Sequence, residues 1–101
     1  MNVAIYTRNN KELESINTQL ILCREYCEKM GYTVIKEYND EAISGALQNM
    51  EKLTKLLIDS NFPVFQKIIF HRIDRITRDE SMYYSLKNHL NGFGVAFESV
   101  N

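Results

Sequence analysis

The sequence is poor in proline, cysteine and glycine. It has one proline, two cysteines and four glycines in 101 residues. The glycines are isolated from one another: Gly31, Gly45, Gly92 and Gly94. A glycine-rich phosphate-binding loop is therefore excluded. Cys23 and Cys27 have no further cysteine or histidine at zinc-binding spacing, so we expect buried thiols and neither a metal nor another cofactor.

Long apolar runs and a surplus of one charge are also absent. No run approaches the roughly 20 apolar residues that a membrane-spanning helix needs. The N-terminus, "MNVAIYTRNN", has no basic leader before an apolar stretch, so we expect a cytoplasmic domain without membrane contact. The net charge of −1 excludes a strongly basic sleeve for nucleic acid, and any contact with DNA must come from a local cluster.

The residues that are present predict one domain in which strands alternate with helices. Hydrophobic residues make up 45% and charged residues 25%, as in an ordinary globular domain. Apolar and β-branched runs predict strands at 2–6, 32–38, 67–70 and 95–97. Helical spacing predicts helices from 15 to 31, around 53–57 and from 79 to about 92. This order predicts an α/β, three-layer sandwich with a mainly parallel central sheet and helices on both faces.

The expected helices have recognisable ends and apolar faces. Ser15 and Asp79 are expected to cap the first and third helices, and Gly31 is expected to end the first. The apolar face of the first helix is expected to contain five residues: Ile16, Leu20, Cys23, Cys27 and Met30. That of the third is expected to contain Met82, Tyr83, Leu86 and Leu90.

Charged and polar side chains follow three of the expected strands. In a parallel sheet, ligands bind at the carboxyl ends of the strands. The residues there are Arg8 after the first strand, Asp40 and Ser44 after the second, and Asp74, Arg75 and Arg78 after the third. Guanidinium groups that converge match the oxygens of a phosphate, and a neighbouring aspartate can orient one of them. Surface ion pairs at a helix entrance are the alternative interpretation.

Several motifs together resemble a known family. The segments "IYTR", "INTQ", "NDEAISG" and "KIIFHRIDRITRD" are similar to the N-terminal catalytic domain of the resolvase/invertase serine recombinases, over about residues 3–100. The resemblance implies a resolvase-like fold and site-specific DNA strand exchange by a homo-oligomer. In that family a serine attacks a DNA phosphodiester and forms a covalent phosphoserine link. Arginines hold the phosphate, and no metal is required.

The resemblance assigns roles to individual positions. Arg8, Arg75 and Arg78 correspond to the arginines that bind the DNA phosphate, with Asp74 as their acidic partner. Supporting positions are Gln19, Asp40 and Ser44. Tyr6 resembles the family's aromatic residue before the arginine, although a buried tyrosine at a strand end is the simpler and preferred interpretation.

The sequence departs from the family at three positions. Asn10 stands where the family has its nucleophilic serine, and a carboxamide has no ionisable oxygen that could attack phosphorus. Met50 stands where a further arginine is usual, and Glu14 where a glutamine is common. We therefore expect a catalytically impaired recombinase domain.

Two other functions are compatible with these residues. One is a non-catalytic module that regulates or oligomerises with a recombinase, and the other is a small α/β domain that binds a phosphate ligand. The sequence ends at "FESVN", whereas the family continues into an interface helix and a DNA-binding domain. We therefore expect residues 1–101 to form one truncated catalytic-type domain, a monomer or dimer that binds DNA weakly.

Overall fold

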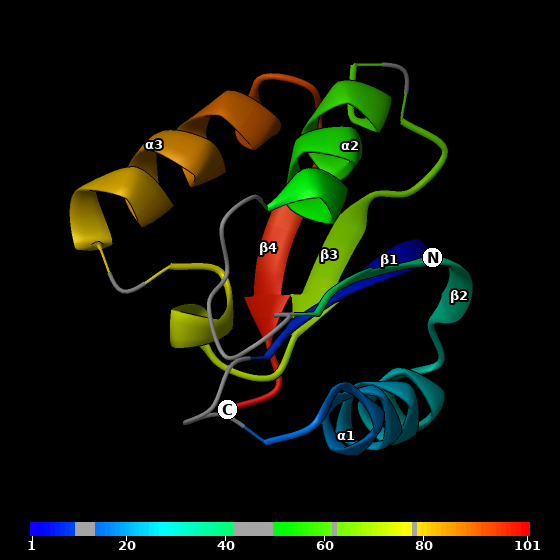
Figure 1. Cartoon of the computed structure of the whole chain (residues 1–101). Helices are drawn as coiled ribbons and strands as arrows, with labels where there is room; N and C mark the ends of the chain where they lie inside the picture. The colour runs from blue at the N-terminus through cyan, green and yellow to red at the C-terminus, as the bar shows by residue number, and fades with distance from the viewer. Residues whose placement is uncertain (10–13, 42–49, 62, 78) are drawn as a thin grey trace.

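The order of strands and helices confirms the predicted alternation. The computed structural model describes the chain except for residues 10–13, 42–49, 62 and 78. The elements, shown in Figure 1, are β1 (Asn2–Arg8), α1 (Ile16–Met30), β2 (Thr33–Asp40), α2 (Glu51–Asp59), β3 (Lys67–Phe70), the short 3-10 helix η1 (Ile73–Arg75), α3 (Glu80–Asn91) and β4 (Ala96–Ser99). β1 and β2 each end two residues later than predicted.

The four strands form one parallel sheet in the order β2-β1-β3-β4. β1 is central because its apolar run is buried on both faces. Its Ile5 pairs with Glu37 of β2 on one side and with Ile69 of β3 on the other. All strands run the same way, so Arg8 and Asp40 end opposite each other at one edge, which we call the carboxyl edge.

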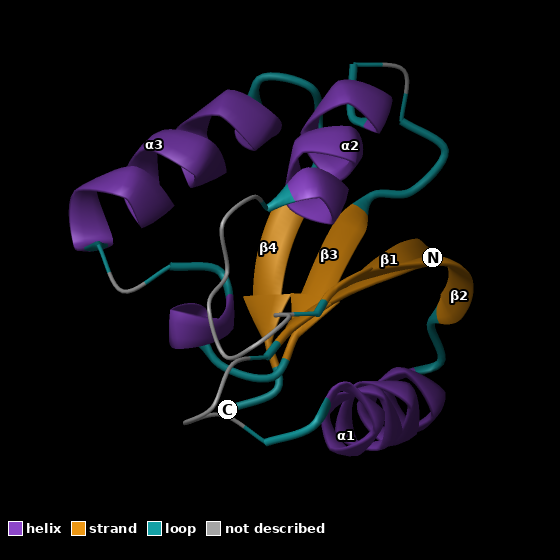
Figure 2. Cartoon of the chain, viewed as in Figure 1, coloured by secondary structure: helices purple, strands orange, loops and turns teal. Residues whose placement is uncertain are grey.

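Helices cover both faces of the sheet, which confirms the three layers. In Figures 1 and 2, α1 lies on one face, and α2 and α3 lie together on the other. Alternate side chains of β1 supply the two cores. The core under α1 consists of Val3, Ile5, Leu20, Cys23, Cys27 and Ile69. The larger core under α2 and α3 includes Ala4, Tyr6, Leu53, Leu56, Phe70 and Leu90.

The predicted helix ends of α1 and α3 are confirmed. Ser15 accepts a hydrogen bond from the main-chain N–H of Thr18 at the start of α1. Gly31 ends that helix with φ of 76°, a left-handed conformation that glycine adopts without a steric penalty. Asp79 caps α3 by accepting from the N–H groups of Ser81 and Met82.

Two residues predicted to face the core are exposed instead. Met30 is 49% exposed because it occupies the last position of α1. Met82 is 40% exposed, since one helical position separates it from Tyr83, which does face the core. The same face of α3 buries Leu90 and partly buries Leu86.

The two cysteines are free and buried, as predicted. No helix within the described residues is both long and apolar enough to cross a bilayer. In that part of the chain, no three histidine, cysteine or acidic side chains gather closely enough to hold a metal ion.

Candidate functional site: an arginine and carboxylate cluster

Arg8, the last residue of β1, is held by Gln19 of α1. The buried Gln19 side chain accepts from the main-chain N–H of Arg8 at 3.2 Å and donates to its carbonyl oxygen at 2.7 Å. It also donates to the carbonyl oxygen of Glu14 at 3.0 Å. α1 therefore sets the main-chain position of Arg8, and the supporting role of Gln19 in a catalytic site stays a prediction.

The side chain of Arg8 extends toward η1. Its Nη2 donates to the main-chain carbonyl oxygen of Asp74 at 2.8 Å. Its Nε is buried and has no hydrogen-bond acceptor among the described residues. The contact brings the end of β1 next to the segment that follows β3.

Arg75, in η1, lies inside a set of carboxylates. Glu14 binds it in a bidentate manner: Nε donates to Oε1 at 2.8 Å and Nη2 donates to Oε2 at 2.6 Å. Nη1 donates to Asp74 Oδ1 at 2.5 Å. Asp74 was predicted to orient an arginine, and it contacts both Arg8 and Arg75. The bidentate partner of Arg75, however, is Glu14.

His71 completes this arrangement at the end of β3. Its Nδ1 donates to Glu14 Oε1 at 2.7 Å, while its Nε2 accepts from the side-chain amide of Asn101 at 2.8 Å. The hydrogen bonds from Arg75 lower the pKa of Glu14 from its ordinary value to about 2, and the bond from His71 adds to this effect. We call Arg8, Glu14, His71, Asp74 and Arg75 the arginine cluster.

Asp40 occupies a buried structural position beside Arg8. Its carboxylate accepts from the hydroxyl of Tyr6 at 2.7 Å and from the main-chain N–H groups of Lys52 and Leu53 at 2.8 and 3.0 Å. It therefore caps α2, whose own N-cap residue, Met50, makes no side-chain hydrogen bond. Burial raises the pKa of Tyr6, and the hydrogen bond to Asp40 raises it further.

Three of the predicted site residues lie outside the described residues: Asn10, Ser44 and Arg78. Their predicted roles therefore remain predictions. Met50 is described: it is partly buried and packs against the core under α2 and α3.

A hollow adjoins the arginine cluster. It has a volume of about 390 Å³ and is lined by Ile73, Asp74, Thr77, Glu80, Tyr83 and Tyr84. Asp74 belongs to both the cluster and the hollow. The carboxyl edge thus combines paired charges with a concave surface.

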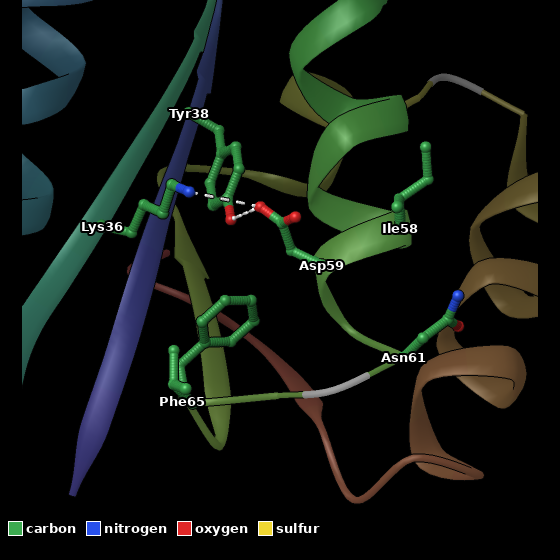
Figure 3. A pocket seen from close by; sticks show the side chains of 7 residues that line it. Lys36, Tyr38, Ile58, Asp59, Asn61 and Phe65 are labelled. Carbon is green, nitrogen blue, oxygen red and sulfur yellow. Dashed lines mark hydrogen bonds and ion pairs between the residues drawn. The ribbon is translucent and has the colours of Figure 1, made fainter.

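A second hollow lies between β2 and the end of α2, and its two charged side chains pair with each other. Figure 3 shows Lys36 and Tyr38 pointing toward Asp59. The Tyr38 hydroxyl donates to Asp59 at 2.6 Å and the Lys36 ammonium at 3.3 Å. The hydrogen bond from Tyr38 lowers the pKa of Asp59. The remaining lining is largely apolar: Ile58, Asn61, Val64 and Phe65.

The structure adds two residues that the sequence did not place in the site. Glu14 stood out only as a departure from a common glutamine, and His71 had no assigned role. Glu14 and Arg75 are 61 positions apart, so no local spacing could have predicted their ion pair. The five residues of the arginine cluster provide charged side chains in defined orientations, but none of them is an activated nucleophile.

A family model and one solved structure indicate the kind of domain, and a second solved structure shares its fold. The model described as "Resolvase, N terminal domain" matches residues 3–101. The crystal structure of the N-terminal catalytic domain of TP901-1 integrase is 29% identical, with a TM-score of 0.86, and the match covers 100% of this chain and 78% of that one. A resolvase family site-specific recombinase from Streptococcus pneumoniae has a TM-score of 0.88 at 16% identity, covering 99% and 72%.

A third structure shows the same fold. It is the C-terminal catalytic domain of ISC1926 TnpA, an IS607-like serine recombinase, at 22% identity and a TM-score of 0.84, covering 100% of this chain and 70% of that one. No match was found among curated protein sequences. The family model spans nearly the whole chain, so the chain belongs to the resolvase family of serine recombinases and corresponds to its N-terminal catalytic domain.

Proposed function

We propose that this domain takes part in site-specific DNA recombination, that it binds the phosphate backbone through Arg8 and the neighbouring arginines, and that it is catalytically impaired as written. The observation that carries the proposal is the meeting of Arg8, Asp74 and Arg75 at the carboxyl edge of a recombinase fold. Arginine forks suit this task because phosphoryl transfer depends mainly on positioning and on neutralising the phosphate oxygens.

Two departures from the family support the impairment. Asn10 provides no oxygen that a base could activate for attack on phosphorus. Loss of a nucleophile costs on the order of a million-fold in rate in a well-studied hydrolase. Met50 packs against apolar side chains where the family's arginine would add positive charge. Loss of one such charge-stabilising group costs about 3 kcal/mol of transition-state stabilisation.

The phosphate-binding part is tested by measuring binding to a fluorescent DNA duplex at several salt concentrations. We expect weak, non-specific binding, with a dissociation constant of about 10⁻⁴ M or weaker at physiological salt. Arg8→Gln should lower the slope of log K against log salt by about one. Arg24→Gln is the matched control, because Arg24 is an exposed arginine of α1 that pairs with Glu37. Equal slopes for the two variants would contradict a specific role for Arg8.

The impairment is tested by denaturing electrophoresis of a labelled, nicked duplex that carries a crossover sequence of this family. We expect no covalent band from the unmodified chain and little recovery from Asn10→Ser alone. Asn10→Ser with Met50→Arg, in a chain that carries a family-type interface helix and DNA-binding domain, should form a phosphoserine link. A covalent band from the unmodified chain would overturn the impairment.

A non-catalytic regulator of an active recombinase is the second candidate. It is favoured by Asn10 at the nucleophile position and by the carboxylates that already bind Arg75. The test adds the chain to a reaction of an active serine recombinase and measures the recombination rate. Arg24→Gln, which changes only a surface ion pair, is the control for non-specific effects. An unchanged rate at saturating chain concentration would exclude the regulatory role for that recombinase.

A further inference from the structure

The guanidinium of Arg75 is already bound by carboxylates. Glu14 accepts hydrogen bonds from Nε and Nη2, and Asp74 accepts one from Nη1. Each of the three guanidinium nitrogens of Arg75 therefore donates to a carboxylate oxygen. A carboxylate that binds two nitrogens uses the same parallel donor geometry that a phosphate uses. An anion cannot take this face of Arg75 while Glu14 remains on it.

We propose that Glu14 is an internal competitor of the DNA phosphate, occupying the binding face of Arg75 until a phosphate displaces it. This inference rests on the proposed function, because it assumes that the arginine cluster is where the phosphate binds. It goes further by naming the residue that controls access to that site.

The exposure of the two partners supports displacement over a permanent ion pair. The side chain of Arg75 is 6% exposed, whereas that of Glu14 is 25% exposed. Glu14 precedes α1 and lies in no helix or strand, and its main-chain carbonyl is held by Gln19. The Glu14 side chain can therefore leave Arg75 by rotating about its own bonds, without movement of α1 or η1.

Arg8 differs from Arg75 in this respect. The contact described for its guanidinium is with a neutral carbonyl oxygen of Asp74, which does not cancel its charge. Arg8 therefore provides the attraction for an incoming phosphate, and Glu14 determines whether Arg75 joins it. Replacing Glu14 by glutamine keeps the size of the side chain and removes the competing charge.

The experiment is an NMR titration of the folded chain with inorganic phosphate, against sodium chloride at matched ionic strength. The Nε–Hε signals of arginine are followed, because Arg75 Nε donates directly to Glu14. We expect Glu14→Gln to bind phosphate at Arg75 at least about tenfold more tightly than the unmodified chain does. Glu37→Gln is the matched control, since Glu37 also binds one arginine in a bidentate manner and its loss changes the net charge equally.

The outcomes separate this inference from the proposed function. If the Arg75 signal titrates equally in the unmodified chain and in Glu14→Gln, the site binds phosphate and competition by Glu14 is wrong. If the Arg8 signal responds and that of Arg75 responds in neither protein, competition is again wrong while phosphate binding stands. If neither arginine responds in any variant, both proposals fail. An equal gain in Glu37→Gln would assign the effect to net charge and overturn the inference.

Glu14→Asp provides a second test that keeps the charge beside buried Arg75. The shorter side chain makes a poorer bidentate contact, so we expect phosphate affinity between those of the unmodified chain and Glu14→Gln. The melting temperature should also rise with added phosphate more in both variants than in the unmodified chain, because a ligand that binds only the folded state stabilises it. An equal rise in all three proteins would contradict competition by Glu14.

Discussion

A single buried glutamine sets the main-chain position of Arg8. Gln19 satisfies both the N–H and the carbonyl oxygen of Arg8. Gln19→Leu should leave these groups unpaired and lower the free energy of unfolding by about 2–3 kcal/mol, measured by urea denaturation. Asn17→Leu, at an exposed position of the same helix, should change it by less than about 0.5 kcal/mol. Similar losses from the two variants would contradict the role of Gln19.

The ion pair of Glu14 predicts a stability that depends on pH. The pKa of Glu14 is lowered to about 2 in the folded chain, chiefly by the hydrogen bonds from Arg75. A lowered carboxyl pKa means that the stabilisation is complete above the ordinary pKa and is lost as the pH falls toward 2. The gap in unfolding free energy between the unmodified chain and Glu14→Gln should therefore shrink between pH 5 and pH 2, by on the order of 3 kcal/mol in total. Urea denaturation at stepped pH measures it, and a gap that does not change with pH would refute the assignment.

At the scale of elements, α2 depends on a cap that comes from β2. Asp40 accepts from Tyr6 and from two N–H groups of α2 in a buried position. Asp79, in contrast, is the exposed residue directly before α3 and caps that helix locally. Asp40→Ala should therefore cost about 3 kcal/mol of unfolding free energy, and Asp79→Ala about 1 kcal/mol. Hydrogen exchange should speed up at Lys52 and Leu53 in the first variant only. Equal losses of unfolding free energy in the two variants would contradict the larger contribution of the buried cap.

The same comparison shows which elements could be predicted from the sequence. Ser15, Gly31 and Asp79 each bond main-chain groups only a few positions away, in the helix that they begin or end. Local patterns could therefore predict the ends of α1 and the start of α3. The cap of α2 comes from Asp40, which is 12 positions before the nearest N–H that it accepts from. No local rule connects residues at that separation, and the role of Asp40 therefore required the structure.

At the scale of the whole molecule, α1 is fixed to the sheet by a core that contains both cysteines. Burial raises the pKa of Cys23 to about 12 and that of Cys27 to about 11, so neither thiol is ionised at neutral pH. A thiol reagent such as DTNB should label them only when α1 separates from the sheet. The labelling rate should increase with urea in parallel with unfolding, as measured by circular dichroism. Rapid labelling of the folded chain would contradict this packing.

The order of layers was predictable, but the charge pairing was not. Alternating periodicity and the parallel strand rule predicted three layers and placed Arg8 and Arg75 at one edge. Which carboxylate binds Arg75 depends on the meeting of two loops, before α1 and after β3, that only the completed sheet brings together. Long-range pairs of this kind leave no periodic signal in a single sequence.

The contacts of Arg8 bear on how the residue at position 10 and this arginine can change in evolution. Its main chain is held by Gln19 and its guanidinium contacts Asp74, both of which are remote from position 10 in the sequence. Within the described residues, the contacts that hold Arg8 are therefore supplied by α1 and by η1. Under the proposed function, phosphate binding and nucleophilic attack depend on different residues, so selection could retain the first after the second is lost.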